Sequence, residues 1–253
     1  MNMRLTSRSF LLYGATRAGG KAIALALAVA LVGGLGGGLG DIAAAAEEAA
    51  PDEVRVMTFG DSLTAGYGLT RENGFAAQMS VWLQENGTPQ GVPVRILNAS
   101  VSGSTTAGGV RRLDWALADD PDAVIVELGG NDLLRGTDPA ETRANLEAIL
   151  SRAAAEDIEV LLVGLIAKDN YGPEYREAFN AIYPDLAEKY GTALQLDFFG
   201  ALPEANADQL PYLQSDGTHP NAEGIAKVVA DMGPRVQALI SDVLEDRSAP
   251  VQN

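Results

Sequence analysis

The sequence predicts an α/β protein, a three-layer α/β/α sandwich built on a parallel sheet. Three observations predict it. Short β-prone runs alternate with longer helical stretches along the chain. The runs are apolar at consecutive positions, as in strands that are buried on both faces. Polar loops follow the strands, and strand–helix alternation with right-handed crossovers brings such loops to one edge of the sheet, where sites form.

Five apolar runs are expected to form the strands, and five stretches between and after them are expected to form the main helices. The strands are Val54–Phe59, Val94–Asn98, Ala123–Leu128, Glu159–Leu165 and the weaker Ala193–Leu196. The helices are Phe75–Glu85, Thr106–Ala118, Pro139–Ala155, Pro173–Lys189 and a last helix after Pro220. In the last helix, apolar residues recur at helical spacing on one face. Gly233-Pro234 is expected to break or kink that helix, because proline removes a backbone hydrogen bond.

The first 46 residues have the layout of a secretory signal peptide. Four basic residues precede an apolar run from Ala22 to Leu39, and small residues follow at Ala43–Ala46. A retained membrane anchor is the alternative, since about 18 apolar residues can just span a bilayer. The glycines at 33–40 make a poor helix and favour cleavage. We therefore expect residues 1–46 to be a leader, residues 47–253 to be one domain, and the mature protein to be periplasmic or secreted, without a membrane span.

Composition excludes several classes of function. The 253 residues are 47% hydrophobic, which suits one well-buried domain, and their net charge is −16. Removing residues 1–46 leaves 14 Lys and Arg against 33 Asp and Glu, a net charge of −19, so nucleic acid is not an expected partner. The chain has no cysteine and one histidine, His219, which excludes thiolate sites, disulfides and multi-histidine metal sites.

Two loops follow the first two strands. Gly60–Thr64 places Ser62 at a strand-to-helix turn, where a hydroxyl projects outward beside backbone N–H groups. A plain helix cap is the alternative for Ser62, and Asp61 is expected to be an acid at the helix start rather than part of the site wall. Asn98–Ser104 includes Gly103, whose backbone N–H can approach a ligand closely, although an ordinary turn is the favoured explanation when this loop is considered alone.

Two further loops follow the third strand and precede the last helix. Asn131 can aim an amide at a reacting carbonyl as an oxyanion donor, or it can serve only as a polar turn with an Asx cap. Asp132 beside it is left out of the catalytic set. Asp216 and His219 are three residues apart, so a tight turn can let the carboxylate fix the imidazole tautomer. Together the four loops supply a nucleophile, an oriented base and oxyanion donors, which is the set that acyl transfer needs.

Five segments carry a resemblance to a known family, and they span almost all of the chain after Val54. They are FGDSLTAGYGL (59–69), NASVSGSTTAGG (98–109), VELGGNDLLRG (126–136), NYGPEYREAFNAIYPDLAEKYG (170–191) and DGTHPNAEG (216–224). The chain resembles the SGNH (GDSL-type) hydrolases, in particular the bacterial periplasmic subgroup called thioesterase I, lysophospholipase L1 or arylesterase.

The resemblance implies a flavodoxin-like sandwich with a five-stranded parallel sheet. It also implies Ser62 as nucleophile, His219 as base and Asp216 as its orienting acid, and an oxyanion hole of the Ser62 N–H, the Gly103 N–H and the Asn131 side chain. No metal or organic cofactor is implied. Ala167-Lys168-Asp169 departs from relatives in a loop that borders the acyl site in the subgroup, and the Gly233-Pro234 pair makes the last helix unusual.

The sequence thus predicts a monomeric serine esterase that acts on a small carboxylic ester, that is, an aryl ester, an acyl-thioester or a lysophospholipid. A carbohydrate acetylesterase of the same superfamily is one alternative, weakly disfavoured by an aromatic content of 6%. A non-catalytic periplasmic binding domain is another, but it would have no need for the four loops together. Chain length of the acyl group, leaving group and export route stay open.

Overall fold

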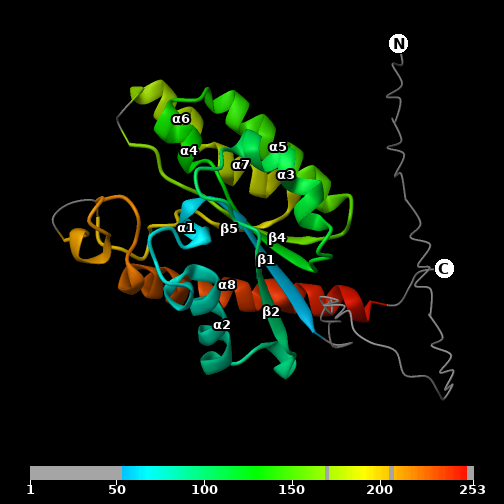
Figure 1. The fold of residues 1–253 in the computed structure, drawn as a ribbon. Coiled ribbons are helices and arrows are strands. Elements are labelled where there is room, and N and C mark those ends of the chain that lie inside the picture. The colour runs from blue at the N-terminus through cyan, green and yellow to red at the C-terminus, as the bar shows by residue number, and fades with distance from the viewer. Residues whose placement is uncertain (1–52, 169–170, 205–207, 250–253) are drawn as a thin grey trace, which may run out of the picture. The chain divides into compact units, whose positions relative to one another are not determined.

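The computed structural model describes residues 53–168, 171–204 and 208–249. Within these residues, a five-stranded sheet has the order β2-β1-β3-β4-β5, and every neighbouring pair is parallel (Figure 1). The strands are β1 (Val54–Gly60), β2 (Val94–Asn98), β3 (Ala123–Glu127), β4 (Glu159–Val163) and β5 (Ala193–Gln195). The predicted α/β/α fold class is therefore confirmed. The expected leader lies outside the described residues.

Helices cover both faces of the sheet (Figure 1). One face carries α2 (Phe75–Asn86) and α8 (Ala222–Ser248), and the other carries α3 (Thr106–Leu117), α5 (Pro139–Ala154), α6 (Pro173–Asn180) and α7 (Ile182–Tyr190). Two short helices, α1 (Ser62–Ala65) and α4 (Gly130–Arg135), directly follow β1 and β3. Both lie at the carboxyl edge of the sheet, where the predicted site residues gather.

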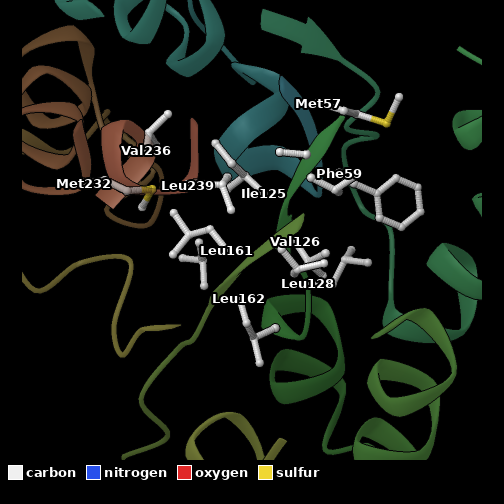
Figure 2. Packing of buried hydrophobic residues seen from close by; sticks show 14 of the residues in the cluster. Met57, Phe59, Ile125, Val126, Leu128, Leu161, Leu162, Met232, Val236 and Leu239 are labelled. Carbon is white, nitrogen blue, oxygen red and sulfur yellow. The ribbon is translucent and has the colours of Figure 1, made fainter. Parts of the chain in front are cut away.

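The core lies on both faces of the central strands. All five residues of β3 are buried, whereas β2, at the edge of the sheet, is only half-buried. Ile125 of β3 and Leu161 of β4 face the apolar stripe of α8, whereas Phe59, Val126 and Leu162 lie on the opposite face of the sheet (Figure 2). This two-sided burial explains why the runs are apolar at consecutive positions rather than at alternate ones.

The predicted single helix Pro173–Lys189 is wrong, because the chain forms two helices, α6 and α7, that meet at Ala181. Pro184 has no N–H to donate to the carbonyl of Asn180, so one continuous helix would lack a hydrogen bond there. The Asn180 side chain instead pairs with the backbone of Ala167, at 2.7 Å to its N–H and 3.2 Å to its carbonyl.

The predicted break at Gly233-Pro234 is also wrong, since α8 continues through Pro234 to Ser248. Residues on both sides of the pair, including Met232 and Val236, are buried, so packing holds the two halves in one line. A Cβ at Gly233 would lie 2.6 Å from the ring of Trp82, so the glycine allows α2 and α8 to approach. The other predicted element ends agree with the structure to within two residues.

Candidate active site

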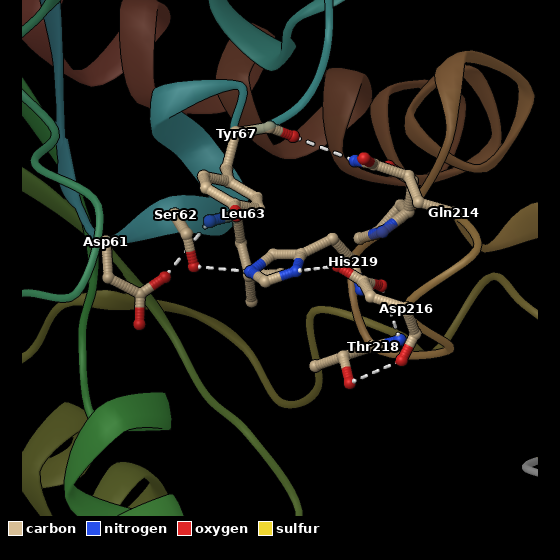
Figure 3. A network of polar contacts seen from close by, with 9 residues as sticks. Asp61, Ser62, Leu63, Tyr67, Gln214, Asp216, Thr218 and His219 are labelled. Carbon is tan, nitrogen blue, oxygen red and sulfur yellow. Dashed lines mark hydrogen bonds and ion pairs between the residues drawn. The ribbon is translucent and has the colours of Figure 1, made fainter.

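The nucleophile candidate Ser62 begins a four-residue helix directly after β1. Asp61 caps that helix, because its carboxylate accepts the Leu63 N–H at 3.0 Å. The alternative of a plain cap therefore applies to Asp61 and not to Ser62. The Ser62 hydroxyl is free of capping and lies 2.9 Å from Nε2 of His219 (Figure 3).

The turn before α8 presents His219 to Ser62. Nδ1 of His219 lies 2.7 Å from Oδ2 of Asp216, while Oδ1 of Asp216 accepts the backbone N–H groups of His219 and Thr218 at 3.0 and 2.9 Å (Figure 3). These hydrogen bonds, the His219 N–H first, lower the pKa of Asp216 to about 2. The carboxylate therefore stays ionised near neutral pH and directs the other imidazole nitrogen at the serine.

Gln214 and Tyr67 connect the two loops, and sequence reasoning assigned neither of them a role. Nε2 of Gln214 donates to the carbonyls of Tyr67 and Pro220 at 2.8 and 2.9 Å, and its backbone N–H donates to the carbonyl of His219 at 2.7 Å. The ring of Tyr67 lies over the imidazole, with centroids 4.7 Å apart (Figure 3). Gln214 thereby ties the serine loop to the histidine loop.

Asn131 lies at the start of α4 and points toward the serine loop. Its amide nitrogen donates to Oδ2 of Asp61 at 2.9 Å and to the carbonyl of Ser104 at 3.2 Å. Both amide hydrogens thus have protein acceptors, and an oxyanion would have to replace one of them. Gly103 adjoins this contact in the loop after β2, with a φ of +78° that favours glycine. The structure therefore gathers the Asn131 and Gly103 loops beside Asp61.

Asp132 is buried and serves the scaffold of this region. Its two carboxylate oxygens accept from the backbone N–H and the hydroxyl of Thr106 at 2.8 and 2.6 Å. Because Thr106 starts α3, this pair fixes α4 against the end of the Gly103 loop. Leaving Asp132 out of the catalytic set agrees with these contacts.

Glu127 is a buried acid that sequence reasoning missed, at the end of β3. Its Oε2 accepts from the Asp61 N–H at 3.3 Å and from the Thr64 hydroxyl at 3.2 Å. Burial and the nearby Asp61 carboxylate raise the pKa of Glu127 well above its ordinary value, and burial raises the pKa of Asp61 as well. A Cβ at Gly60 would lie 2.7 Å from the Glu127 carboxylate and 2.2 Å from the Thr64 hydroxyl, so only glycine fits there.

Arg112 is a second missed residue, and it joins the ends of β1 and β2. Its guanidinium donates to the carbonyls of Ala99 and Gly60 at 2.6 and 2.9 Å and lies 3.8 Å from the centroid of the Phe59 ring. Burial lowers the pKa of Arg112 to about 10, so the group remains a cation at neutral pH. The serine loop is therefore held by hydrogen bonds to both Glu127 and Arg112.

A cavity of about 850 Å³ lies beside Ser62 and His219. Its apolar lining includes Leu133, Leu134, Leu165, Ile166, Phe199 and Leu202. Lys168, Asp197 and Glu204 also line it. Lys168 belongs to the loop that the sequence singled out as unusual, and Asp169 of that loop lies outside the described residues. The size and apolar lining of the cavity suit a small ligand with a hydrocarbon part.

Comparison with known proteins identifies the family. The profile of the GDSL-like lipase/acylhydrolase family matches residues 58–227, which contain every candidate site residue. The chain belongs to this family. The chain is therefore an enzyme, and the predicted resemblance to SGNH (GDSL-type) hydrolases is confirmed.

Individual relatives agree with the family. The chain is 37% identical to the esterase TesA of Pseudomonas aeruginosa over 186 residues, which cover 73% of this chain and 89% of that protein. It is 36% identical to the thioesterase 1/protease 1/lysophospholipase L1 of Escherichia coli K12 over 76% of this chain and 87% of that one. Among solved structures, the SGNH-hydrolase family esterase AlinE4 superposes with a TM-score of 0.60 and 40% identity, covering 75% of this chain and 98% of AlinE4.

Proposed function

We propose that this GDSL-family enzyme is a serine esterase whose catalytic triad is Ser62, His219 and Asp216. The observation that carries the proposal is the unbroken chain of short contacts at the cavity. The Ser62 hydroxyl lies 2.9 Å from His219, and His219 lies 2.7 Å from the Asp216 carboxylate. A nucleophile within hydrogen-bond reach of a base that a third group orients is the arrangement that covalent acyl transfer requires.

Acylation begins with the attack of Ser62 on the carbonyl carbon of the ester. His219 takes the hydroxyl proton as the new C–O bond forms, and Asp216 stabilises the imidazolium that results. His219 then returns the proton to the leaving oxygen or sulfur, the scissile bond breaks, and an acyl-serine remains. Water activated by His219 repeats the sequence in deacylation and releases the acid.

The oxyanion of each tetrahedral intermediate would be held by the backbone N–H groups of Ser62 and Gly103 and by the Asn131 amide. In the resting site the Asn131 amide donates to Asp61 and to the Ser104 carbonyl. The oxyanion would replace the longer of these two bonds, the one to Ser104. The loss of one such donor typically costs about 10²–10³-fold in rate.

The substrate class follows from the cavity and from the names of the relatives. A mostly apolar cavity of about 850 Å³ suits an uncharged acyl chain. The relatives are named esterase, thioesterase 1/protease 1/lysophospholipase L1 and, in Vibrio mimicus, arylesterase. We therefore propose small esters, acyl-thioesters or lysophospholipids as substrates, hydrolysed without a metal or organic cofactor.

The domain limits and the location are also part of the proposal. Residues 1–46 would be removed as a signal peptide, and residues 47–253 would act as a monomer in the periplasm or outside the cell. Among the described residues, no helix combines the length and the apolar character that crossing a bilayer requires. Mass spectrometry of the exported protein tests the cleavage position directly.

The decisive experiment compares Ser62→Ala with the wild-type enzyme on p-nitrophenyl esters from C2 to C16 and on an acyl-thioester. We expect Ser62→Ala to lose at least about 10⁴-fold in kcat and to lose labelling by a serine-directed fluorophosphonate. Ser151→Ala, which removes an exposed serine on α5, is the matched control and should keep both. Turnover by Ser62→Ala at the wild-type rate would sink the proposal.

A further inference from the structure

Beside the candidate site lies an aromatic residue that the proposed mechanism does not use. Ser62 and His219 line the cavity. The described residues that line the cavity do not include Tyr67, yet the Tyr67 ring packs on the imidazole of His219, with ring centroids 4.7 Å apart. Tyr67 is 53% exposed, so much of its ring faces solvent next to the base.

The turn that carries Tyr67 is fixed by several contacts. Gly66 and Gly68, on either side of it, have φ values of +82° and +72°, a backbone that favours glycine. The N–H of Tyr67 donates to the carbonyl of Ser62 at 3.2 Å, and the carbonyl of Tyr67 accepts from Gln214 at 2.8 Å. An exposed aromatic ring is therefore presented at a set place beside the catalytic pair.

The chemistry of acyl transfer decides what can lie there. The acyl chain and the leaving group extend in different directions from the carbonyl carbon that Ser62 attacks. His219 must protonate the leaving oxygen, so the leaving group has to contact His219. With the acyl chain in the cavity, the leaving group extends along the solvent side of the imidazole, where Tyr67 lies.

We propose that Tyr67 forms a leaving-group subsite that selects aromatic alcohols and phenols. This inference rests on the proposed serine esterase function. Offset or edge-to-face contact between Tyr67 and the ring of the substrate adds binding energy that a saturated ring does not obtain, equivalent to about 2- to 12-fold in a rate or binding constant. Because the leaving group departs in the first step, the subsite acts on acylation and not on deacylation.

The test compares two esters with the same acyl group and leaving alcohols of similar acidity, benzyl butyrate and cyclohexylmethyl butyrate. The measured quantity is kcat/KM, which reports acylation, in the wild type, Tyr67→Leu and Tyr67→Phe. Intrinsic reactivity cancels when each variant is compared with the wild type on the same ester. We expect Tyr67→Leu to lower kcat/KM about 2- to 12-fold more for the benzyl ester, and Tyr67→Phe to keep the wild-type ratio.

A Tyr67 that only supports His219 would behave differently, because every ester uses His219. Equal losses for the two esters in Tyr67→Leu would overturn the subsite while leaving the esterase function intact. If the wild type hydrolysed neither of these two esters and none of the p-nitrophenyl esters, the proposed function itself would be overturned. Trp115→Leu, which removes an exposed aromatic residue on α3, is the matched control and should leave the ratio unchanged.

Discussion

The two loops that meet at the Ser62–His219 contact are held in opposite ways. The serine loop rests on buried groups, since Asp61, Thr64 and Glu127 are at most 2% exposed and hydrogen-bond one another. The histidine loop is a surface turn in which the side chains of Asp216 and His219 are 39% and 21% exposed. The position of the nucleophile therefore depends on the core, whereas the position of the base depends on a local turn. Stability and activity should respond separately to changes in the two loops.

The largest effect expected from this difference is the loss of activity in His219→Ala. We expect kcat/KM to fall by about 10⁴-fold or more, because the chain holds no other histidine to serve as base. The free energy of unfolding should change by less than about 1 kcal/mol, since the side chain lies on a surface turn. Ester kinetics and urea unfolding check the two halves of this prediction. A large loss of stability would show that the histidine loop is as much a part of the core as the serine loop.

A change at Glu127 should affect the free energy of unfolding more than it affects the activity. Glu127→Ala leaves the buried Asp61 N–H without its acceptor and leaves the Thr64 hydroxyl with the Ser100 hydroxyl alone, at 2.9 Å, which we expect to lower the free energy of unfolding by about 1–3 kcal/mol. Glu127→Gln keeps an acceptor of the same shape and is the control, with a smaller loss. Urea unfolding followed by circular dichroism measures both. Equal stability of the alanine variant and the wild type would contradict the role given to Glu127.

The smallest expected effects concern the pH dependence of stability. The contribution of Glu127 should fall as pH rises, whereas the contribution of Asp216 should fall as pH is lowered. The folded-state pKa of Glu127 is raised, so its contribution to stability is present below pH 4.5 and is lost as pH rises above that value. The folded-state pKa of Asp216 is depressed to about 2, so its contribution is present above about pH 4 and is lost as pH falls toward 2. The exposure of Asp216 makes its effect the smaller one.

Unfolding midpoints in urea across pH 2–8 measure these two contributions as differences from the wild type. Glu127→Gln should remove the decline above pH 4.5, and Asp216→Asn should remove part of the decline below pH 4. Carboxyl groups that do not touch the substituted residue contribute equally to both sides of each comparison, whereas the pKa of Asp61 shifts together with a change at Glu127. Parallel curves for a variant and the wild type would show that the substituted carboxyl has the same pKa in the folded and unfolded states.

The fold was predictable because its signals are local. Apolar runs, polar loops and helical stripes each occupy a few neighbouring residues, and the sheet confirms the five expected strands. The two wrong predictions concern proline. Pro184 divides a helix that the sequence pattern joined, whereas Pro234 lies inside a helix that the pattern divided. Packing between α8 and its neighbours decides the second case, and packing partners are not visible in a sequence.

The candidate site was predictable to the same degree. Ser62, Gly103, Asn131, Asp216 and His219 follow from the residues of four loops, and the structure brings these loops to one edge of the sheet. Glu127 could have been found, because it is the one acid in the run AVIVEL. Arg112, Gln214 and Tyr67 could not have been found in the sequence. Each of them contacts a loop that is distant along the chain, and only folding creates that contact.

The position of His219 between Ser62 and Asp216 has a spectroscopic consequence. The chain holds one histidine, so every imidazole signal in a nuclear magnetic resonance spectrum comes from His219 in the candidate active site, without any need for assignment. The Tyr67 ring over that imidazole should displace its carbon-bound proton resonances through the ring current. The same proton signals would report acylation, inhibitor binding and titration of the imidazole, because they come from ring carbons bonded to the nitrogen that faces Ser62.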